Sequence, residues 1–219
     1  MRGPVADLIV ALDVPTLREA ERLVAALSPD VRWFKVGLEL FTAAGPDAVR
    51  VVRGRGARVF LDLKLHDIPA TVARATAAAG RLGASLLTVH ATGGDEMLRA
   101  AAAVRRRPKL VAVTALTSLR ATRATVRALG EAAVAAGCDG LVMAPREAAL
   151  FRGRDLVLVT PGVRAAGDAS HDHARSATPT EAVRAGATHL VVGRPVRDAK
   201  DPRAAARAIL SEIRRARAG

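Results

Sequence analysis

The stretch RVFLDLKLHDIPATVARATAAAGRLG, residues 58–83, contains one complete strand-and-helix unit. Its first part, Arg58–Lys64, is a short and mostly apolar run of the kind that forms β-strands. Its second part, Thr71–Leu82, is rich in Ala and has helical spacing. Gly83 follows, and glycine adopts the left-handed conformation that ends many helices at little cost. The stretch therefore predicts a strand, a short loop and a helix, in that order.

The same unit recurs along the whole chain. Runs that are apolar on both faces and alternate with helices indicate a parallel sheet covered on its outer surface. Eight such units predict an α/β fold, a (β/α)₈ TIM barrel, as a single domain over residues 1–219. An open doubly wound sheet is the alternative, but no G-x-G-x-x-G follows the first run. The predicted strands are Leu8–Val14, Val31–Gly37, Arg58–Lys64, Ala84–His90, Lys109–Ala115, Gly140–Met143, Leu156–Thr160 and His189–Gly193.

Helices are predicted between these strands. Thr16 precedes LREAERLVAAL, and Glu19 three positions later completes the pattern of a capping box. Glycines at the predicted helix ends favour left-handed caps: Gly56, Gly83, Gly137 and Gly186. The other predicted helices are Thr71–Leu82, Asp95–Val104, Thr125–Ala136, Glu147–Phe151, Thr180–Ala185 and Ala204–Arg217.

Composition limits the classes of protein to consider. The single cysteine, Cys138, excludes a disulfide framework within the chain and fits a reducing compartment. The early sequence lacks the pattern of a signal peptide, and no run is long and apolar enough for a membrane span. We therefore expect a cytoplasmic protein with no membrane partner. The net charge of +13 alone would allow nucleic-acid binding, but no aromatic residues accompany the arginines to stack on bases, so we expect no nucleic-acid partner.

Charged residues stand at or near the carboxyl ends of several predicted strands, where a barrel places its active site. In the third strand, two-residue alternation puts Asp62 and Lys64 on one face and Leu61 and Leu63 on the other. A charge inside a strand is costly to bury unless it is paired. Such a cluster predicts a preorganised electrostatic site made of Asp13, Lys35, Asp62 and Lys64.

A phosphate site is predicted after strands seven and eight, where barrels commonly bind phosphate. Gly193 allows backbone N–H groups to approach an anion, and Arg164 and Arg194 can bind its oxygens. The long segment Arg164–Thr178 between them predicts a functional loop, which we interpret as a lid. Thr117 after strand five offers a hydroxyl to the edge of a heterocycle.

Six motifs in order resemble the orotidine 5′-phosphate decarboxylase family. The segment DLKLHDIP, Asp62–Pro69, matches the family's D-x-K-x-x-D signature. The others are ALDV at Ala11–Val14, FKVG at Phe34–Gly37, LTS at Leu116–Ser118, TPGVR at Thr160–Arg164 and VVGRP at Val191–Pro195. The resemblance implies decarboxylation of orotidine 5′-monophosphate to UMP, the last step of de novo UMP synthesis. It also implies that the reaction needs no metal and no organic cofactor.

The resemblance also implies roles for individual residues. Lys64 would protonate C6 of the pyrimidine, and Asp62 would lie beside the departing carboxylate. Lys35 and Asp13 would hold the ribose hydroxyls. Asp67 would be a catalytic residue that reaches the site of a second subunit, which implies a homodimer. Substrate contacts are further implied for Thr71 across the interface, Thr117 at the base, and Arg164, Gly193 and Arg194 at the phosphate.

The chain departs from the family pattern at one predicted phosphate contact. His173 stands where the family commonly has Gln, and histidine has a shorter reach and a pH-dependent charge.

Two alternatives to the decarboxylase remain at this point. A sugar-phosphate lyase of the same superfamily, of the 3-keto-gulonate 6-phosphate decarboxylase or hexulose-phosphate synthase type, resembles a Mg²⁺-dependent design with Glu where this chain has Lys35. A charged lysine cannot be a ligand of Mg²⁺, which binds oxygen atoms. The second alternative is a non-catalytic, basic, nucleic-acid-binding barrel, which only the net charge supports.

Overall fold

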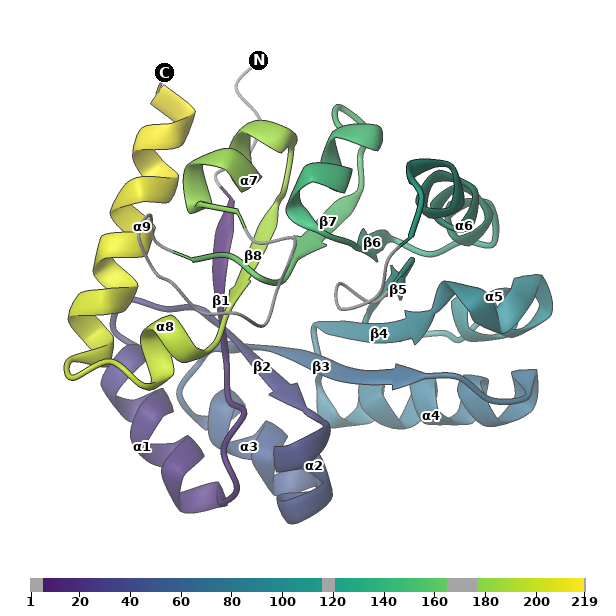
Figure 1. Ribbon diagram of the computed structural model, residues 1–219. Coiled ribbons are helices and arrows are strands. Elements are labelled where there is room, and N and C mark those ends of the chain that lie inside the picture. Colours follow the sequence, from purple (N-terminus) through teal and green to yellow (C-terminus); the bar gives the residue numbers. More distant parts are fainter. Residues whose placement is uncertain (1–5, 116–120, 165–176, 219) are drawn as a thin grey trace.

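The computed structural model describes residues 6–115, 121–164 and 177–218. Its eight parallel strands close into a barrel in which each strand pairs with the next and β1 pairs with β8 (Figure 1). The predicted (β/α)₈ fold is therefore confirmed. The strands are β1 Asp7–Ala11, β2 Trp33–Gly37, β3 Arg58–Leu65, β4 Leu86–His90, β5 Lys109–Val113, β6 Gly140–Val142, β7 Val157–Thr160 and β8 His189–Val192.

Helices surround the barrel in a ring (Figure 1). Those that the sequence predicts are all present, with ends that shift by a few residues, and one of them is a 3₁₀ helix. They are α1 Leu17–Leu27, α4 Pro69–Leu82, α5 Gly94–Ala102, α6 Arg123–Ala135, η2 Pro145–Leu150, α7 Pro179–Ala185 and α9 Pro202–Ala218.

Four short helical segments were not predicted: α2 Leu38–Ala44, α3 Pro46–Gly54, η1 Ala91–Gly93 and α8 Arg194–Arg197. α2 and α3 follow Gly37 and Gly45, which offer no side chain to cap the first turn. A capping side chain is therefore missing from both sequences, and only α3 has a weaker N-terminal signal, in Pro46 and Asp47.

The helix ends confirm most of the predicted capping. The backbone φ angle is positive at Gly56, Gly83, Gly137 and Gly186. At the start of α1, the Thr16 hydroxyl accepts a hydrogen bond from the Glu19 N–H at 3.3 Å and donates to the Glu19 carboxylate at 3.0 Å. In a capping box the Glu19 carboxylate would accept from the Thr16 backbone N–H. Here it accepts from the Thr16 hydroxyl instead, so this second bond joins two side chains.

Side chains that point inward fill the barrel in layers. Near the amino ends of the strands the Trp33 ring packs edge-on against His189, with ring centroids 5.1 Å apart. The guanidinium of Arg58 lies over the Trp33 ring. Burial lowers the pKa of His189 to about 4, so the imidazole is neutral at neutral pH. Trp33 belongs to an apolar cluster inside the barrel whose other buried members are Ile9, Ala11, Phe60, Leu86, Val111, Val159 and Val191.

A second and larger apolar layer lies between the strands and the helices. Cys138, the only cysteine of the chain, is buried there between α6 and β6. Burial raises the pKa of its thiol to about 12. Among the described residues, no helix combines the length and the apolar character needed to cross a membrane.

Candidate active site

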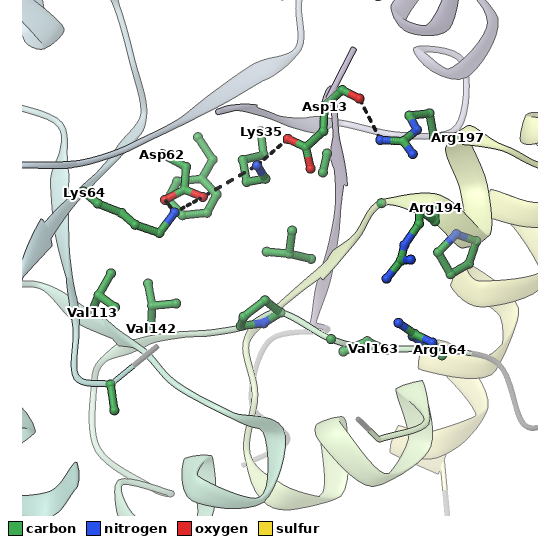
Figure 2. A pocket seen from close by; sticks show the side chains of 18 residues that line it. Asp13, Lys35, Asp62, Lys64, Val113, Val142, Val163, Arg164, Arg194 and Arg197 are labelled. Carbon is green, nitrogen blue, oxygen red and sulfur yellow. Dashed lines mark hydrogen bonds and ion pairs between the residues drawn. The ribbon is translucent and has the colours of Figure 1, made fainter. Parts of the chain in front are cut away.

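The carboxyl ends of the strands surround a cavity of about 450 Å³, a volume typical of small-molecule sites. Its position at this end of the barrel is the one that barrel enzymes use for catalysis. Figure 2 shows how the labelled side chains lie around it. The charged residues of the lining are Asp13, Lys35, Asp62, Lys64, Arg164, Arg194 and Arg197.

Four of these charges form a continuous row along one side of the cavity (Figure 2). Lys64 Nζ lies 2.9 and 3.0 Å from the two oxygens of Asp62. Lys35 Nζ lies 3.6 Å from Asp62 Oδ2 and 2.7 Å from Asp13 Oδ1. Alternate signs therefore follow one another along the row, and each buried charge has an opposite neighbour, which offsets the cost of its burial.

The same inward face of each strand changes character from one end to the other. Along β2, the inward positions run from Trp33 through Lys35 to Gly37. Along β3 they run from Phe60 to Asp62. Two-residue spacing thus places an apolar plug at the amino end and the charges at the carboxyl end.

The two-residue alternation of side chains along β3 ends at Asp62, so the prediction that regular alternation brings Lys64 and Asp62 to one face is corrected. The pairing register between β3 and β4 shifts between Leu61 and Leu65. Lys64 has a φ of 51°, one of two positive values at non-glycine residues in the described chain. The side chains of Lys64 and Asp62 still meet, but they do so through an irregular strand rather than a flat one.

The far end of the cavity is basic. Arg164 follows β7 and is 9% exposed, and Arg194 begins α8 directly after Gly193. Figure 2 shows the two guanidinium groups pointing toward one another, on the side of the cavity opposite Lys64. The predicted charged cluster and the predicted phosphate residues therefore line two ends of one cavity.

The Arg164 main chain also holds the two described ends of the long loop together. Its N–H donates to the Ala177 carbonyl at 3.0 Å, and the Ala177 N–H donates to the Gly162 carbonyl at 3.4 Å. The predicted lid thus starts and ends beside the cavity, while residues 165–176, including His173, lie outside the described residues. Thr117 lies outside them as well.

Asp67 and Thr71 do not line the cavity of their own chain. Asp67 is exposed, and its carboxylate accepts a hydrogen bond from the Ile68 N–H at 2.6 Å. Thr71 lies in the first turn of α4. Ile68 beside them is 64% exposed, unusually high for a large apolar side chain. Their predicted contribution to a second subunit's site therefore stays a prediction.

Three residues of the site were not predicted from the sequence. Gly37 leaves room for the charges, because a Cβ there would lie 2.7 Å from Lys35 Nζ. Thr88 contacts both Asp62 and Lys64. Arg197 lines the cavity and donates to the Asp13 carbonyl at 2.6 Å. Only Arg197 carried a visible signal, because it is a charged residue close to the Gly193-Arg194 motif.

His90 at the end of β4 is close to this row. Its ring centroid lies 5.5 Å from that of His66. Burial lowers the pKa of His90, and the nearby His66 and Lys64 lower it further. A neutral imidazole is therefore favoured, and the positive charge beside Asp62 comes from the lysines.

Comparison with known proteins identifies the family. The model of the orotidine 5′-phosphate decarboxylase / HUMPS family matches residues 6–209. The chain belongs to this family. The described residues contain no group of three or more His, Cys, Asp or Glu side chains that could hold a metal ion.

Relatives within the family are similar over nearly their whole length. A protein of Moorella thermoacetica named orotidine 5′-phosphate decarboxylase is 51% identical, over 94% of this chain and 91% of its own. One of the same name from Anaeromyxobacter sp. is 52% identical, over 96% and 99%. A crystal structure of orotidine 5′-phosphate decarboxylase from Lactobacillus acidophilus superposes with a TM-score of 0.81 at 36% identity, covering 95% and 99%.

Proposed function

We propose that this enzyme decarboxylates orotidine 5′-monophosphate to UMP and CO₂, the last step of de novo UMP synthesis. One observation carries the proposal: a single cavity has an alternating Lys–Asp row along one side and two arginines at the far end. Relatives about half identical to this chain are named for the same reaction.

The charge of the cavity suits this substrate. Five basic and two acidic side chains line it, which leaves an excess of positive charge. The substrate carries a phosphate of nearly two negative charges and a carboxylate of one. Arg164, Arg194 and the backbone at Gly193 would bind the phosphate, as donors that approach an anion from several directions.

The row would act on the other end of the substrate. Breaking the bond between C6 and the carboxyl carbon releases CO₂ and leaves an electron pair on C6 in the plane of the ring. The π-system cannot delocalise that pair. The Lys64 ammonium, held by Asp62, would stabilise the developing negative charge and then transfer a proton from Nζ to C6.

Asp62 and Asp13 would complete the arrangement. The Asp62 carboxylate would lie beside the departing carboxylate, and like charges would favour its loss as neutral CO₂. Lys35 and Asp13 would hold the ribose hydroxyls, since both lie between Asp62 and the phosphate end. The distant phosphate grip would contribute by fixing the substrate in this position.

The position of Lys35 argues against the Mg²⁺-dependent members of the family. Its ammonium lies between the carboxylates of Asp13 and Asp62, within 3.6 Å of each. A divalent ion bound to both carboxylates would have to displace this cation. We therefore propose a decarboxylation that needs no metal, in which the Lys64 ammonium takes the part that an organic cofactor would play in stabilising the negative charge.

We further propose that residues 1–219 act as one domain in a cytoplasmic homodimer. Asp67 and Thr71, exposed or partly exposed at the start of α4 and just before it, would complete the partner's site. The exposed Ile68 between them would be covered by the same interface. The reducing compartment is favoured by the free cysteine, and no membrane or nucleic-acid partner is required.

The central test measures the rate at which orotidine 5′-monophosphate is consumed, from its ultraviolet absorbance, in the presence of EDTA. The wild-type enzyme is expected to consume the substrate at an undiminished rate. Lys64→Ala is expected to abolish turnover while circular dichroism shows an intact fold. Near-normal activity of that variant would refute the role of Lys64, and a loss of wild-type activity in EDTA would favour the Mg²⁺-dependent type.

A mixing experiment tests the shared site. Lys64→Ala and Asp67→Ala chains are each expected to be inactive alone. Mixed in equal amounts, they would form hybrid dimers with one complete site, and about a quarter of all sites would be active. No recovery, after mass spectrometry proves subunit exchange, would contradict the shared site.

A further inference from the structure

Thr88 lies inside the barrel, beneath the row of charges. Leu86 of β4 belongs to the apolar interior, so two-residue spacing directs Thr88 inward one step closer to the cavity. The side chain is fully buried and does not line the cavity. Thr88 is therefore placed to act on the site only through other residues.

A single hydroxyl connects Thr88 to both members of the Lys64–Asp62 pair. Thr88 Oγ1 accepts a hydrogen bond from the Lys64 backbone N–H at 2.7 Å. It donates its own proton to Asp62 Oδ1 at 3.1 Å. A hydroxyl offers one donor and two acceptor sites, so both contacts can be made at the same time.

The first contact explains how Lys64 keeps its unusual backbone. The shift in register between Leu61 and Leu65 removes Lys64 from the regular ladder between β3 and β4. Its positive φ is a conformation that residues with a side chain rarely adopt and that needs support from its surroundings. The Thr88 hydroxyl supplies this partly buried N–H with a partner, as a ladder carbonyl does elsewhere.

The second contact fixes the orientation of Asp62. The oxygen that accepts from Thr88 also accepts from Lys64 Nζ at 2.9 Å. The other Asp62 oxygen is left to Lys64 and Lys35. One hydroxyl thus contacts the backbone from which the Lys64 side chain leaves the strand and the carboxylate that meets the Lys64 ammonium.

We propose that Thr88 is the positioning residue of the proton donor: its hydroxyl holds the Lys64 backbone and the Asp62 carboxylate in the arrangement that protonates C6. This assignment rests on the proposed function of Lys64. Thr88 makes no contact with the substrate, so its loss impairs the chemical step and leaves substrate binding nearly unchanged.

The test compares three variants. Thr88→Val keeps the shape of the side chain and removes the hydroxyl, whereas Thr88→Ser keeps the hydroxyl. Thr188→Val is the matched control at the opposite end of the barrel. The Thr188 hydroxyl also accepts from a backbone N–H, that of Leu158 at 2.8 Å, and donates to the Leu158 carbonyl at 3.2 Å.

We expect kcat of Thr88→Val to fall about tenfold to a hundredfold, as the loss of a hydrogen bond to a charged group predicts. KM for orotidine 5′-monophosphate and the dissociation constant of UMP should change less than about threefold. Thr88→Ser should recover most of the lost kcat. Thr188→Val should lower the unfolding temperature and leave kcat unchanged. If Thr88→Val does not fold, Thr88→Ala takes its place with the same criteria.

Three results would overturn the assignment: an unimpaired kcat in Thr88→Val, an equal loss of kcat in Thr188→Val, or no recovery in Thr88→Ser. The proposed function is tested separately by the wild-type enzyme. An inactive wild type overturns both proposals, whereas an active wild type with an unimpaired Thr88→Val overturns only that for Thr88.

Discussion

At the scale of single residues, Gly37 shows how the site depends on a side chain that is absent. The residue ends β2 beside the pair formed by Lys35 and Asp13. Its φ of −96° and ψ of −174° are open to any residue, so backbone freedom does not require glycine there. Space does, because a Cβ would lie 2.7 Å from Lys35 Nζ and 3.0 Å from Asp13 Oδ1.

Gly37→Ala should therefore displace the Lys35 ammonium without unfolding the barrel. We expect kcat/KM to fall about tenfold or more, the usual effect of losing a charge-assisted contact. Gly54→Ala is the matched control, since a Cβ at this helical position meets nothing within 4 Å. Steady-state kinetics and thermal unfolding of both variants check the prediction, and wild-type kinetics in Gly37→Ala would contradict it.

The residues of the charged row could be predicted because a charge within an apolar strand is conspicuous. Asp62 and Lys64 are two positions apart, and alternation alone brings them to one face. Thr88 could not be predicted in this way, since a β-branched residue in a strand is ordinary and its partners lie 24 and 26 positions away. The positive φ of Lys64 could not be predicted either, because it depends on the irregular pairing between β3 and β4, which the sequence of one strand does not reveal.

At the scale of elements, the short helix α8 connects the two ends of the cavity. It begins with Arg194 at the predicted phosphate site and ends with Arg197. Arg197 Nη1 donates to the Asp13 carbonyl at 2.6 Å, and its Nε and Nη2 donate to the two oxygens of Asp198. The hydrogen bond with Asp198 raises the pKa of Arg197, so the link between α8 and the segment after β1 stays charged.

Arg197→Ala should loosen α8 and with it the grip on the phosphate. We expect KM for orotidine 5′-monophosphate to rise roughly tenfold with a smaller change in kcat. The control is Arg203→Ala, which removes an arginine paired with Asp30 on the outer surface. An unchanged KM in Arg197→Ala, measured by initial rates, would show that α8 keeps its place without this link.

The elements themselves were predicted to different degrees for a physical reason. Long buried strands and capped helices leave a periodic signal in the sequence, and those were found. α8 is only four residues long, which leaves no room for a periodic face. α2 is as long as the predicted α7, but it begins after Gly37 and so lacks a capping side chain. The closed barrel was predicted from the presence of eight strand-and-helix units, because no single unit indicates closure.

At the scale of the whole molecule, the barrel separates the residues of the cavity from those that seal the opposite end. His189 lies at that sealed end against Trp33, with Asp7 3.8 Å away. Its pKa is lowered to about 4, whereas an unfolded chain binds the proton near pH 6.5. Between these values the unfolded state binds more protons, so stability is complete above pH 6.5 and falls as the pH drops toward 4.

We expect wild-type protein to lose about 3 kcal/mol more unfolding free energy than His189→Gln between pH 7 and pH 4. Carboxylates elsewhere contribute to the acid sensitivity of both proteins, and the comparison subtracts them. Urea titrations at the two pH values measure the difference. Parallel losses in the two proteins would show that His189 is not the group responsible.

The buried Cys138 has a practical consequence, because the chain has a single sulfhydryl. An alkylating reagent can reach it only while the wall formed by α6 and β6 is transiently open. Iodoacetamide at pH 8 should therefore modify the native protein at least about 100-fold more slowly than the protein in urea. Equal rates would mean that this wall opens freely. Otherwise the rate of alkylation, followed by mass spectrometry, reports how often one side of the barrel comes apart in water.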